Sequence, residues 1–314
     1  MDAPLVTVIC LCYNQEQYVA GAIRSVLDQT WPNIQLIVVD DASVDNSRKT
    51  IEEVARKHPE IKTLFLESNL GNCAAFNRGL ALAGGRFIAD LAADDEYMPE
   101  RIEKQVGLFG SLPDDYGVVF TDALLTDETG GKQWGHKQSV FRRGLLDHIP
   151  EGDIFAEVIG KYFISSPSLL IRKEVFDELG GYDETLTYED FDLIVRAARN
   201  WKFAWLDEQL TKVRKLPSGM SQNMYGPEDL KVASTFEVCR KIEKMTRNPE
   251  EEKALDDRLK YEWRQSVLNR NRKMAGEWRA MLKERGAFSW LYECVWVMFL
   301  IGVPIWVLKK KGLR

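Results

Sequence analysis

Several features that would mark a specific class of protein are missing from these 314 residues. Histidine occurs only three times and the five cysteines form no Cys-x-x-Cys pair, so we expect neither a zinc site nor a disulfide framework. The 22 glycines and 11 prolines are too few for a collagen-like or low-complexity chain, and 45% of the residues are hydrophobic. We therefore expect a folded globular protein of one large domain or two smaller ones.

Two common glycine-rich phosphate-binding loops are also missing, G-x-G-x-x-G and G-x-x-x-x-G-K-[ST], so any phosphate must be held by other groups. The formal net charge of −6 argues against nucleic acid as a partner. No basic leader precedes the first predicted strand, which follows Met1-Asp2-Ala3-Pro4 directly, and Cys10 and Cys12 lie in an apolar run. We expect buried thiols and a cytoplasmic protein.

Charge is divided unevenly along the chain. Residues 258–314 contain 13 Lys+Arg and 4 Asp+Glu, a net +9, which leaves −15 for residues 1–257. An acidic body suits divalent cations, whereas a basic, Trp-rich tail suits anionic lipid headgroups. A merely solvated helical face is the alternative for the tail.

Short β-branched runs alternate with helical patterns over the first 120 residues. The predicted strands cover residues 5–12, 35–39, 61–66, 86–89 and 117–120, and the predicted helices lie near 16–29, 46–57, 72–83 and 98–111. This alternation predicts an α/β fold with a mostly parallel sheet flanked by helices. Such sheets bind ligands at the carboxyl ends of their strands. The residues there are polar and mostly acidic: Tyr13-Asn14, Asp40 to Ser43, Asn69 to Asn72, and Asp90 to Asp95.

The pair Asp94-Asp95 is the candidate metal site. Carboxylates at a strand end offer hard oxygen ligands to Mg²⁺ or Mn²⁺, which complete their coordination shell with phosphate and water. The alternative is that both acids cap the next helix, near Met98-Pro99.

The middle of the chain is less regular. Residues 120–155 are polar with weak periodicity, which predicts a mobile loop in which His136 is solvated and is not a catalytic base. A strand is predicted over Ser166 to Ile171, and a helix over Asp190 to Asn200. Glu189 and Asp190 in its first turn favour the helix dipole, but a carboxylate held there could equally act as a general base.

Taken together, these segments resemble family 2 glycosyltransferases of the GT-A fold. The resemblance lies in five motifs that occur in the family's order between residues 5 and about 222: V-T-V-I-C-L-C-Y-N from Val6, V-V-D-D-A-S from Val38, N-L-G from Asn69 followed by N-R-G from Asn77, D-D at Asp94, and G-G-Y-D from Gly180 followed by E-D at Glu189.

The resemblance implies roles for individual residues. Tyr13 corresponds to the aromatic residue that stacks on the nucleotide base, and Asp41 to the carboxylate that hydrogen-bonds the base. Asp94 lies near the ribose and diphosphate, and Asp95 is the principal metal ligand, while Leu11, Asn14 and Asn69 complete the implied nucleotide site. Asp190 is the implied base that deprotonates the acceptor hydroxyl for in-line attack with inversion. A bound cation neutralises the departing nucleoside diphosphate.

Two departures from the family limit this assignment. Leu216 stands where the family often has a histidine, so we expect Arg214, Lys215 or Ser221 to contact the diphosphate, with Glu189 nearby. The Q-x-x-R-W signature of processive synthases is missing, which predicts transfer of one sugar per encounter.

The predicted domains are a catalytic domain over 1–222, a basic helical extension over 223–286 and a membrane-associating tail over 287–314. Phe288 to Leu308 is apolar and ends in Lys309-Lys310-Lys311, but Glu293 and Pro304 interrupt it, and a single span would put the lysines outside. Docking on the inner face of the cell membrane is favoured over a true span, a buried helix or an oligomer contact. It suggests a saccharide acceptor that is lipid-linked, as in polysaccharide assembly.

Two other functions compete with a metal-dependent transferase that uses a nucleotide sugar, with UDP favoured over dTDP or GDP. One is a catalytically silent nucleotide-sugar-binding or scaffold module. Retention of Asp95 and Asp190 argues against it. The other is a nucleotidyltransferase of related fold, which would need a glycine-rich loop where this chain has Cys12-Tyr13-Asn14-Gln15.

Overall fold

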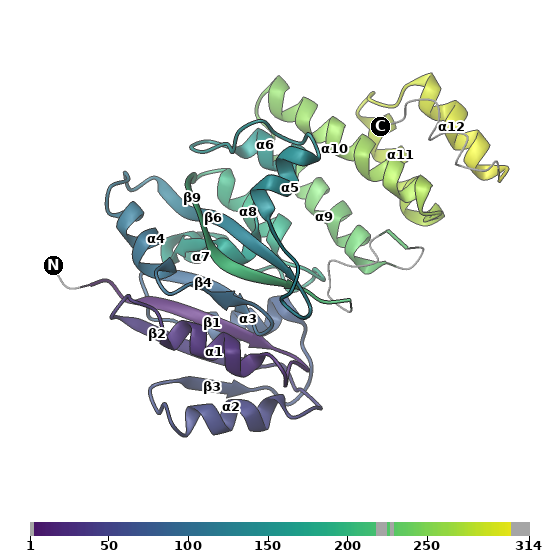
Figure 1. The fold of residues 1–314 in the computed structure, drawn as a ribbon. Coiled ribbons are helices and arrows are strands. Elements are labelled where there is room, and N and C mark those ends of the chain that lie inside the picture. The colour runs from purple at the N-terminus through teal and green to yellow at the C-terminus, as the bar shows by residue number, and fades with distance from the viewer. Residues whose placement is uncertain (1–2, 218–224, 227–228, 303–314) are drawn as a thin grey trace. The chain divides into compact units, whose positions relative to one another are not determined.

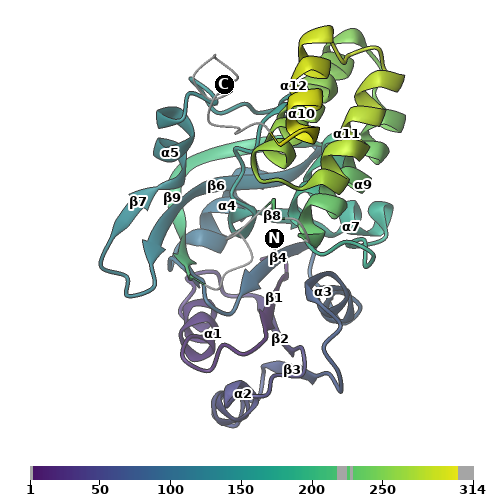
Figure 2. The same cartoon turned by 90° about the vertical axis from the view of Figure 1, so that its right-hand side faces the viewer.

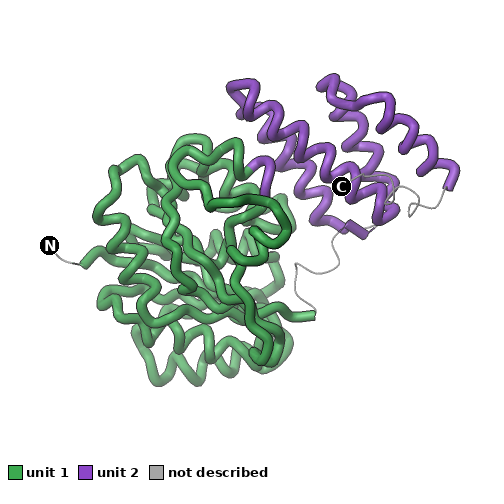
Figure 3. Tube along the Cα trace, turned by 45° about the horizontal axis from the view of Figure 1, so that its top comes forward, with its two compact units in different colours: residues 1–158, 162–219 green, residues 159–161, 220–314 purple. Residues whose placement is uncertain are grey.

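A computed structural model describes residues 3–217, 225–226 and 229–302. Its chain divides into two units: unit 1 contains Met1–Val158 and Tyr162–Gly219, and unit 2 contains Ile159–Lys161 and Met220–Arg314 (Figure 3). The four predicted βα segments at the start of the chain are present in unit 1 as β1 (Val6–Cys12), α1 (Val19–Leu27), β2 (Ile34–Asp40), α2 (Ser47–Ala55), β3 (Lys62–Phe65), α3 (Asn72–Leu80), β4 (Phe87–Ala92) and α4 (Arg101–Phe109).

The remaining elements of unit 1 follow in chain order. They are β5 (Glu96–Tyr97), β6 (Tyr116–Asp127), β7 (Gln133–Gly135), α5 (His136–Arg142), α6 (Phe155–Gly160, which ends in unit 2), a 3₁₀ turn (Ser166–Ser168), β8 (Leu170–Arg172), α7 (Lys173–Leu179), α8 (Asp190–Ala198) and β9 (Lys202–Lys215).

The strands of the described residues form one nine-stranded mixed sheet in the order β3-β2-β1-β4-β8-β6-β9-β5, with β7 paired to β6. Figure 1 labels β1, β2, β3, β4, β6 and β9 of this sheet. The pairs β3–β2, β2–β1, β1–β4 and β6–β9 are parallel, and the pairs involving β8, β5 and β7 are antiparallel. The prediction of a mostly parallel sheet flanked by helices is therefore confirmed.

Alternating side chains of the central strands pack on both faces of the sheet. On one face, Val6, Val8 and Cys10 of β1 join a core cluster with residues of α1 and α4. On the other face α3 lies close to the strands, because a Cβ at Gly79 would come within 2.7 Å of Ile9 Cγ2. Figure 2 shows α1 and α3 on opposite sides of β1. Burial of β1 also confirms that Cys10 and Cys12 are buried thiols.

Three predictions for the middle of the chain were wrong in whole or in part. Residues 120–155 are not a mobile loop, because β6 continues to Asp127 and pairs with β9 as far as Lys215, and α5 follows. His136 is half-buried at the start of α5, where Nε2 donates to the Phe163 carbonyl oxygen at 3.0 Å and burial lowers the pKa of the imidazole. The strand predicted from Ser166 begins only at Leu170, after the 3₁₀ turn.

Unit 2 contains helices α9 (Leu230–Met245), α10 (Pro249–Leu268), α11 (Arg272–Glu284) and α12 (Trp290–Leu300). Asparagine side chains cap two of them: Asn248 Oδ1 accepts from the Glu251 amide at 2.9 Å, and Asn271 Oδ1 accepts from the Met274 amide at 3.1 Å. Their buried stripes, which include Leu255, Leu259, Trp263, Trp278 and Leu282, form the core of the unit. In the described residues, no helix combines the length and apolar character that crossing a membrane requires.

Candidate active site

The carboxyl ends of β1, β2 and β4 meet at one edge of the sheet. Cys12 pairs in register with Asp40, and Leu11 pairs with Ala92. Loops that follow these strands therefore begin side by side. This register brings together the loops that carry Tyr13, Asp41 and Asp94, as the strand-end reasoning predicted.

Asp41 holds the loop between β3 and α3. Its Oδ1 accepts from the Leu70 amide at 2.7 Å and its Oδ2 accepts from the Gly71 amide at 2.9 Å. Gly71 has a φ of +85° and is the N-cap of α3, a conformation that suits glycine. Asp41 is only 5% exposed, so its carboxylate is a buried structural anchor as well as a candidate contact to a base.

The other candidate nucleotide residues surround this loop. The Tyr13 side chain is 47% exposed, which leaves its ring accessible for stacking. Asn14 has a φ of +54°, and its Oδ1 accepts from the Val44 amide at 2.9 Å, which ties the β1 and β2 loops together. Asn69 Nδ2 donates to the Asp41 carbonyl at 3.3 Å, and Leu11 is half-buried in β1.

Asp94 and Asp95 follow β4 and face the end of β9. Asp95 is 4% exposed, and its Oδ1 accepts from the Arg214 amide at 2.9 Å, while Arg214 Nε donates to the Asp94 carbonyl at 3.3 Å. Burial raises the pKa of both carboxyl groups, and the charge of Asp94 raises the pKa of Asp95 further. The helix-cap alternative was wrong, because α4 begins at Arg101 with Glu100 as its N-cap.

This carboxylate pair fits a divalent cation. The buried Asp95 carboxylate and the half-buried Asp94 carboxylate repel each other, and a bound cation would relieve that repulsion with the oxygen ligands it prefers. No group of three or more His, Cys, Asp or Glu side chains arranged for a metal occurs among the described residues. Lys215 is half-buried at the end of β9, beside Arg214, and Ser221 lies outside the described residues.

Asp190 is the first residue of α8, and Glu189 is its N-cap, as predicted. Asp190 Oδ1 accepts from the Phe191 amide at 2.7 Å, and Oδ2 accepts from the Tyr162 hydroxyl. Glu189 Oε2 accepts from Asn72 Nδ2, and burial followed by the charges of Asp190 and Asp90 raises the pKa of Glu189 to about 8. Gly71, which is bound to Asp41, directly precedes Asn72, which is bound to Glu189. These two hydrogen bonds therefore connect the Asp41 loop to the start of α8.

Two residues of the site, Asp90 and Tyr162, were assigned no role from the sequence. Asp90 was grouped with the loop after β4 but lies within the strand, where Tyr182 Oη donates to its Oδ2 at 3.0 Å and burial raises its pKa to about 7. An aspartate inside the apolar run FIADLA is the signal that could have indicated it. Tyr162 has no such local signal, because its contact with Asp190 spans 28 residues.

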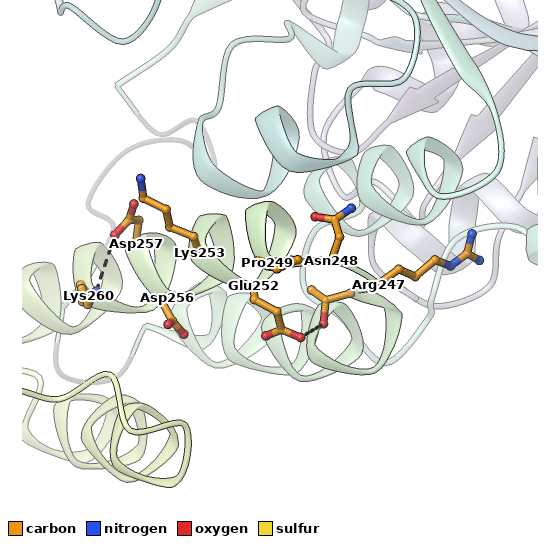
Figure 4. A pocket seen from close by; sticks show the side chains of 9 residues that line it. Arg247, Asn248, Pro249, Glu252, Lys253, Asp256, Asp257 and Lys260 are labelled. Carbon is orange, nitrogen blue, oxygen red and sulfur yellow. Dashed lines mark hydrogen bonds and ion pairs between the residues drawn. The ribbon is translucent and has the colours of Figure 1, made fainter.

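A separate hollow lies in unit 2 and has a volume of about 670 Å³ (Figure 4). It is lined by residues from a single stretch of chain between Thr246 and Lys260. Charged side chains at its rim pair with one another, as Lys260 Nζ does with Asp257 Oδ1 at 3.6 Å. None of the predicted site residues line this hollow, so we assign it no part in the chemistry.

Comparison with known proteins gives consistent results. A family model described as glycosyl transferase family 2 matches residues 7–180. An uncharacterized glycosyltransferase of Methanocaldococcus jannaschii is 30% identical over 222 residues, which cover 68% of this chain and 72% of the relative. EpsE of Bacillus subtilis, also named as a glycosyltransferase, is 30% identical over 246 residues, which cover 77% and 84%.

Two solved structures share the fold. S. aureus TarS 1-349 in complex with UDP-GlcNAc has a TM-score of 0.63 at 18% identity, covering 95% of this chain and 92% of that one. The mannosyltransferase PcManGT from Pyrobaculum calidifontis, in complex with GDP-Man and Mn²⁺, has a TM-score of 0.61 at 15% identity, covering 95% and 80%. At these identities the likeness establishes the fold alone.

Proposed function

Because this chain belongs to glycosyl transferase family 2, we propose that it moves one sugar per encounter from a nucleotide sugar, with UDP as the favoured carrier, to an acceptor hydroxyl with inversion. The observation that carries the proposal is the Asp94-Asp95 pair at the carboxyl end of β4, next to Arg214, in which Asp95 is buried and Asp94 is half-buried. A site of this charge is suited to a cation and a diphosphate and is poorly suited to an anion alone.

Asp95, with Asp94 beside it, is the residue that would hold Mn²⁺ or Mg²⁺. A bound cation supplies charge neutralisation for the departing nucleoside diphosphate. Arg214 and Lys215 are close enough to lower the pKa of Asp94 and Asp95 and supply positive charge at the same edge. The complex of PcManGT with GDP-Man and Mn²⁺ supports a divalent ion in this fold.

The donor nucleotide would lie over the strand ends. Exposed Tyr13 offers a ring to the base, and Asp41 and Asn69 offer polar groups beside it. Leu11 and Asn14 shape the same loop. The TarS complex with UDP-GlcNAc supports UDP as the carrier of the donor sugar. Because PcManGT binds GDP-Man, GDP must be included among the carriers that are tested.

Asp190 is the proposed general base. Its position in the first turn of α8 favours the ionised carboxylate through the helix dipole, and the hydrogen bond from Tyr162 Oη orients one carboxylate oxygen. Glu189, whose pKa is raised to about 8, retains a proton near neutral pH and so places no second negative charge beside Asp190. An ionised base is thereby available to take the proton of an acceptor hydroxyl.

The proposed acceptor is a saccharide carried on a membrane lipid, as in surface-polysaccharide assembly, with the enzyme peripherally attached to the inner face of the cell membrane. The basic, Trp-rich C-terminal region supports this part of the proposal. The predicted domain division into 1–222, 223–286 and 287–314 stays part of the same proposal.

Asp190→Asn separates catalysis from binding. We expect this variant to bind nucleotide sugar and Mn²⁺ with unchanged affinity in calorimetry while its rate of nucleoside diphosphate release falls by about 10³-fold or more. The reference is the wild-type enzyme, for which the rate of nucleoside diphosphate release is measured and the inverted anomeric configuration of the product is determined by NMR. Near-normal turnover of Asp190→Asn would refute the base assignment, and binding without turnover in the wild type would favour the silent module.

A further inference from the structure

The outer face of α12 is apolar and exposed. Five large apolar side chains of this segment are exposed to between 48% and 73%, namely Trp290, Leu291, Val297, Leu300 and Ile301, and Cys294 is exposed between them. Positions 290, 294, 297 and 301 recur every three to four residues, which is the spacing of one face of a helix. The exposed side chains therefore form a continuous stripe, which we call the α12 stripe.

The opposite face of α12 is packed within unit 2. Tyr292 lies edge-on against Trp263 with ring centroids 5.1 Å apart, and Val295 and Phe299 are buried. In addition, the Arg272 guanidinium lies 5.9 Å from the centroid of the Phe299 ring. The helix is thus held by its inner residues, and exposure of the α12 stripe does not result from an unpacked helix.

Glu293, the one charged residue in the sequence of α12, is paired with cations of α11. Arg279 Nη2 lies 2.7 Å from Glu293 Oε1, and Lys283 also forms an ion pair with this carboxylate. These pairs lower the pKa of Glu293 and neutralise its charge. In the sequence Glu293 interrupts the apolar segment, whereas in the structure its charge is compensated.

We propose that the α12 stripe docks unit 2 on an anionic lipid bilayer. Apolar side chains supply the insertion, and the surrounding positive charge supplies attraction to anionic headgroups. Residues 258–314 carry a net +9, and Arg272 and Lys273 of α11 are exposed. Charge also favours a bilayer over a second copy of the chain, because two copies would bring like-charged segments together.

This inference supplies the membrane contact that the lipid-linked acceptor of the proposed function requires. It does not depend on the chemistry at Asp95 or Asp190. Its tests measure vesicle binding and not turnover, so failure of the docking inference and failure of the proposed transfer give different results.

Cys294 allows a direct test without a substitution in the stripe. Cys10, Cys12, Cys73 and Cys239 are buried, so a thiol-reactive, polarity-sensitive dye should label Cys294 selectively in the folded protein. With vesicles of phosphatidylserine and phosphatidylcholine we expect a blue shift and brighter emission, and a much weaker response with phosphatidylcholine alone. The control carries Cys294→Ser and Tyr261→Cys on α10, and its dye should not respond. An unchanged Cys294 spectrum would overturn the proposal.

A charge-matched pair of variants supplies the second test. Leu291→Glu with Val297→Glu should lower vesicle affinity by about tenfold or more. Leu230→Glu with Tyr261→Glu adds the same charge at exposed apolar positions of α9 and α10, which are 69% and 42% exposed, and should keep most of the binding. Melting curves verify that both proteins are folded, and equal vesicle affinity of the two would overturn the proposal.

Two further outcomes would reassign the stripe. If light scattering gives a wild-type dimer and a monomer for Leu291→Glu with Val297→Glu, the stripe is a contact between two copies. If deletion of residues 303–314 abolishes the response of the Cys294 dye to vesicles, the terminal segment binds the bilayer and α12 does not. The proposal predicts a monomer and a retained, weaker dye response.

Discussion

Replacement of Asp41 by asparagine tests whether this residue is a structural anchor as well as a nucleotide contact. Its two carboxylate oxygens accept separate amide hydrogen bonds, from Leu70 at 2.7 Å and from Gly71 at 2.9 Å. Asparagine has one acceptor oxygen, and its amide group would face the second N–H as another donor. The variant therefore loses one charge-assisted hydrogen bond and leaves one amide without this acceptor.

The size of the effect follows from these contacts. A hydrogen bond to a charged group contributes about 1.5–3 kcal/mol. Leu70 lies at the surface, where water replaces part of the lost bond, so we expect the free energy of unfolding to fall by about 2 kcal/mol. At about 2–4 °C per kcal/mol, the melting temperature should fall by about 4–8 °C without any nucleotide present.

Urea unfolding followed by tryptophan fluorescence, without nucleotide or metal, measures the effect. Asp28→Asn is the matched control, because Asp28 is exposed at the end of α1, and its unfolding midpoint should equal that of the wild type. If Asp41→Asn leaves the free energy of unfolding within about 0.5 kcal/mol of the wild type but weakens nucleotide binding, the anchoring role is refuted.

Three other predictions concern the start of α8 and the core of unit 2. Tyr162→Phe should lower kcat about three- to tenfold and move the acidic limb of the pH–rate profile to higher pH, because the Asp190 carboxylate loses a hydrogen-bond donor and becomes harder to ionise. An unchanged pH–rate profile would refute a positioning role for Tyr162. Glu189→Gln should become more stable relative to the wild type as the pH rises from about 4.5 to 8, since the folded wild type keeps a proton on Glu189 that its unfolded chain releases. A difference in the free energy of unfolding that does not change with pH, measured by urea unfolding, would contradict the raised pKa. Arg285→Met should destabilise unit 2 in the same assay by about 1–3 kcal/mol, because Arg285 Nε lies 2.7 Å from Asp256 Oδ1 and its Nη1 3.2 Å from Glu243 Oε1. A urea unfolding curve equal to that of Lys244→Met, at an exposed position of α9, would contradict this.

The predictions from sequence succeeded where local patterns determine the structure. Strand β1 is a β-branched run that is buried along almost its whole length, and the polar residues after β1, β2 and β4 meet because parallel strands place their carboxyl ends together. The end of α8 shows the usual limit, since the helix stops at Ala198 and not at Asn200.

Patterns failed where tertiary pairing decides. Strand β9 contains many charged residues and has no apolar pattern typical of a strand. The structure explains its charge: β5, its partner on one side, has only two residues, so most of β9 lies at the edge of the sheet. The hydrogen bond between Tyr162 and Asp190, the raised pKa of Asp90 and the pairing of Glu293 with Arg279 all join residues distant in the chain. No local spacing reports such contacts.

Thermal stabilisation by nucleotides tests the metal-dependent donor site most directly. The wild type and Asp95→Ala are melted with UDP, dTDP, GDP and their sugars, with and without Mn²⁺. We expect one carrier, UDP foremost, to stabilise the wild type by about 2.7 kcal/mol at about 100 times its Kd when Mn²⁺ is present, and we expect Asp95→Ala to lose this gain. Absence of any Mn²⁺-dependent shift in the wild type, or an equal shift in Asp95→Ala, would contradict this expectation.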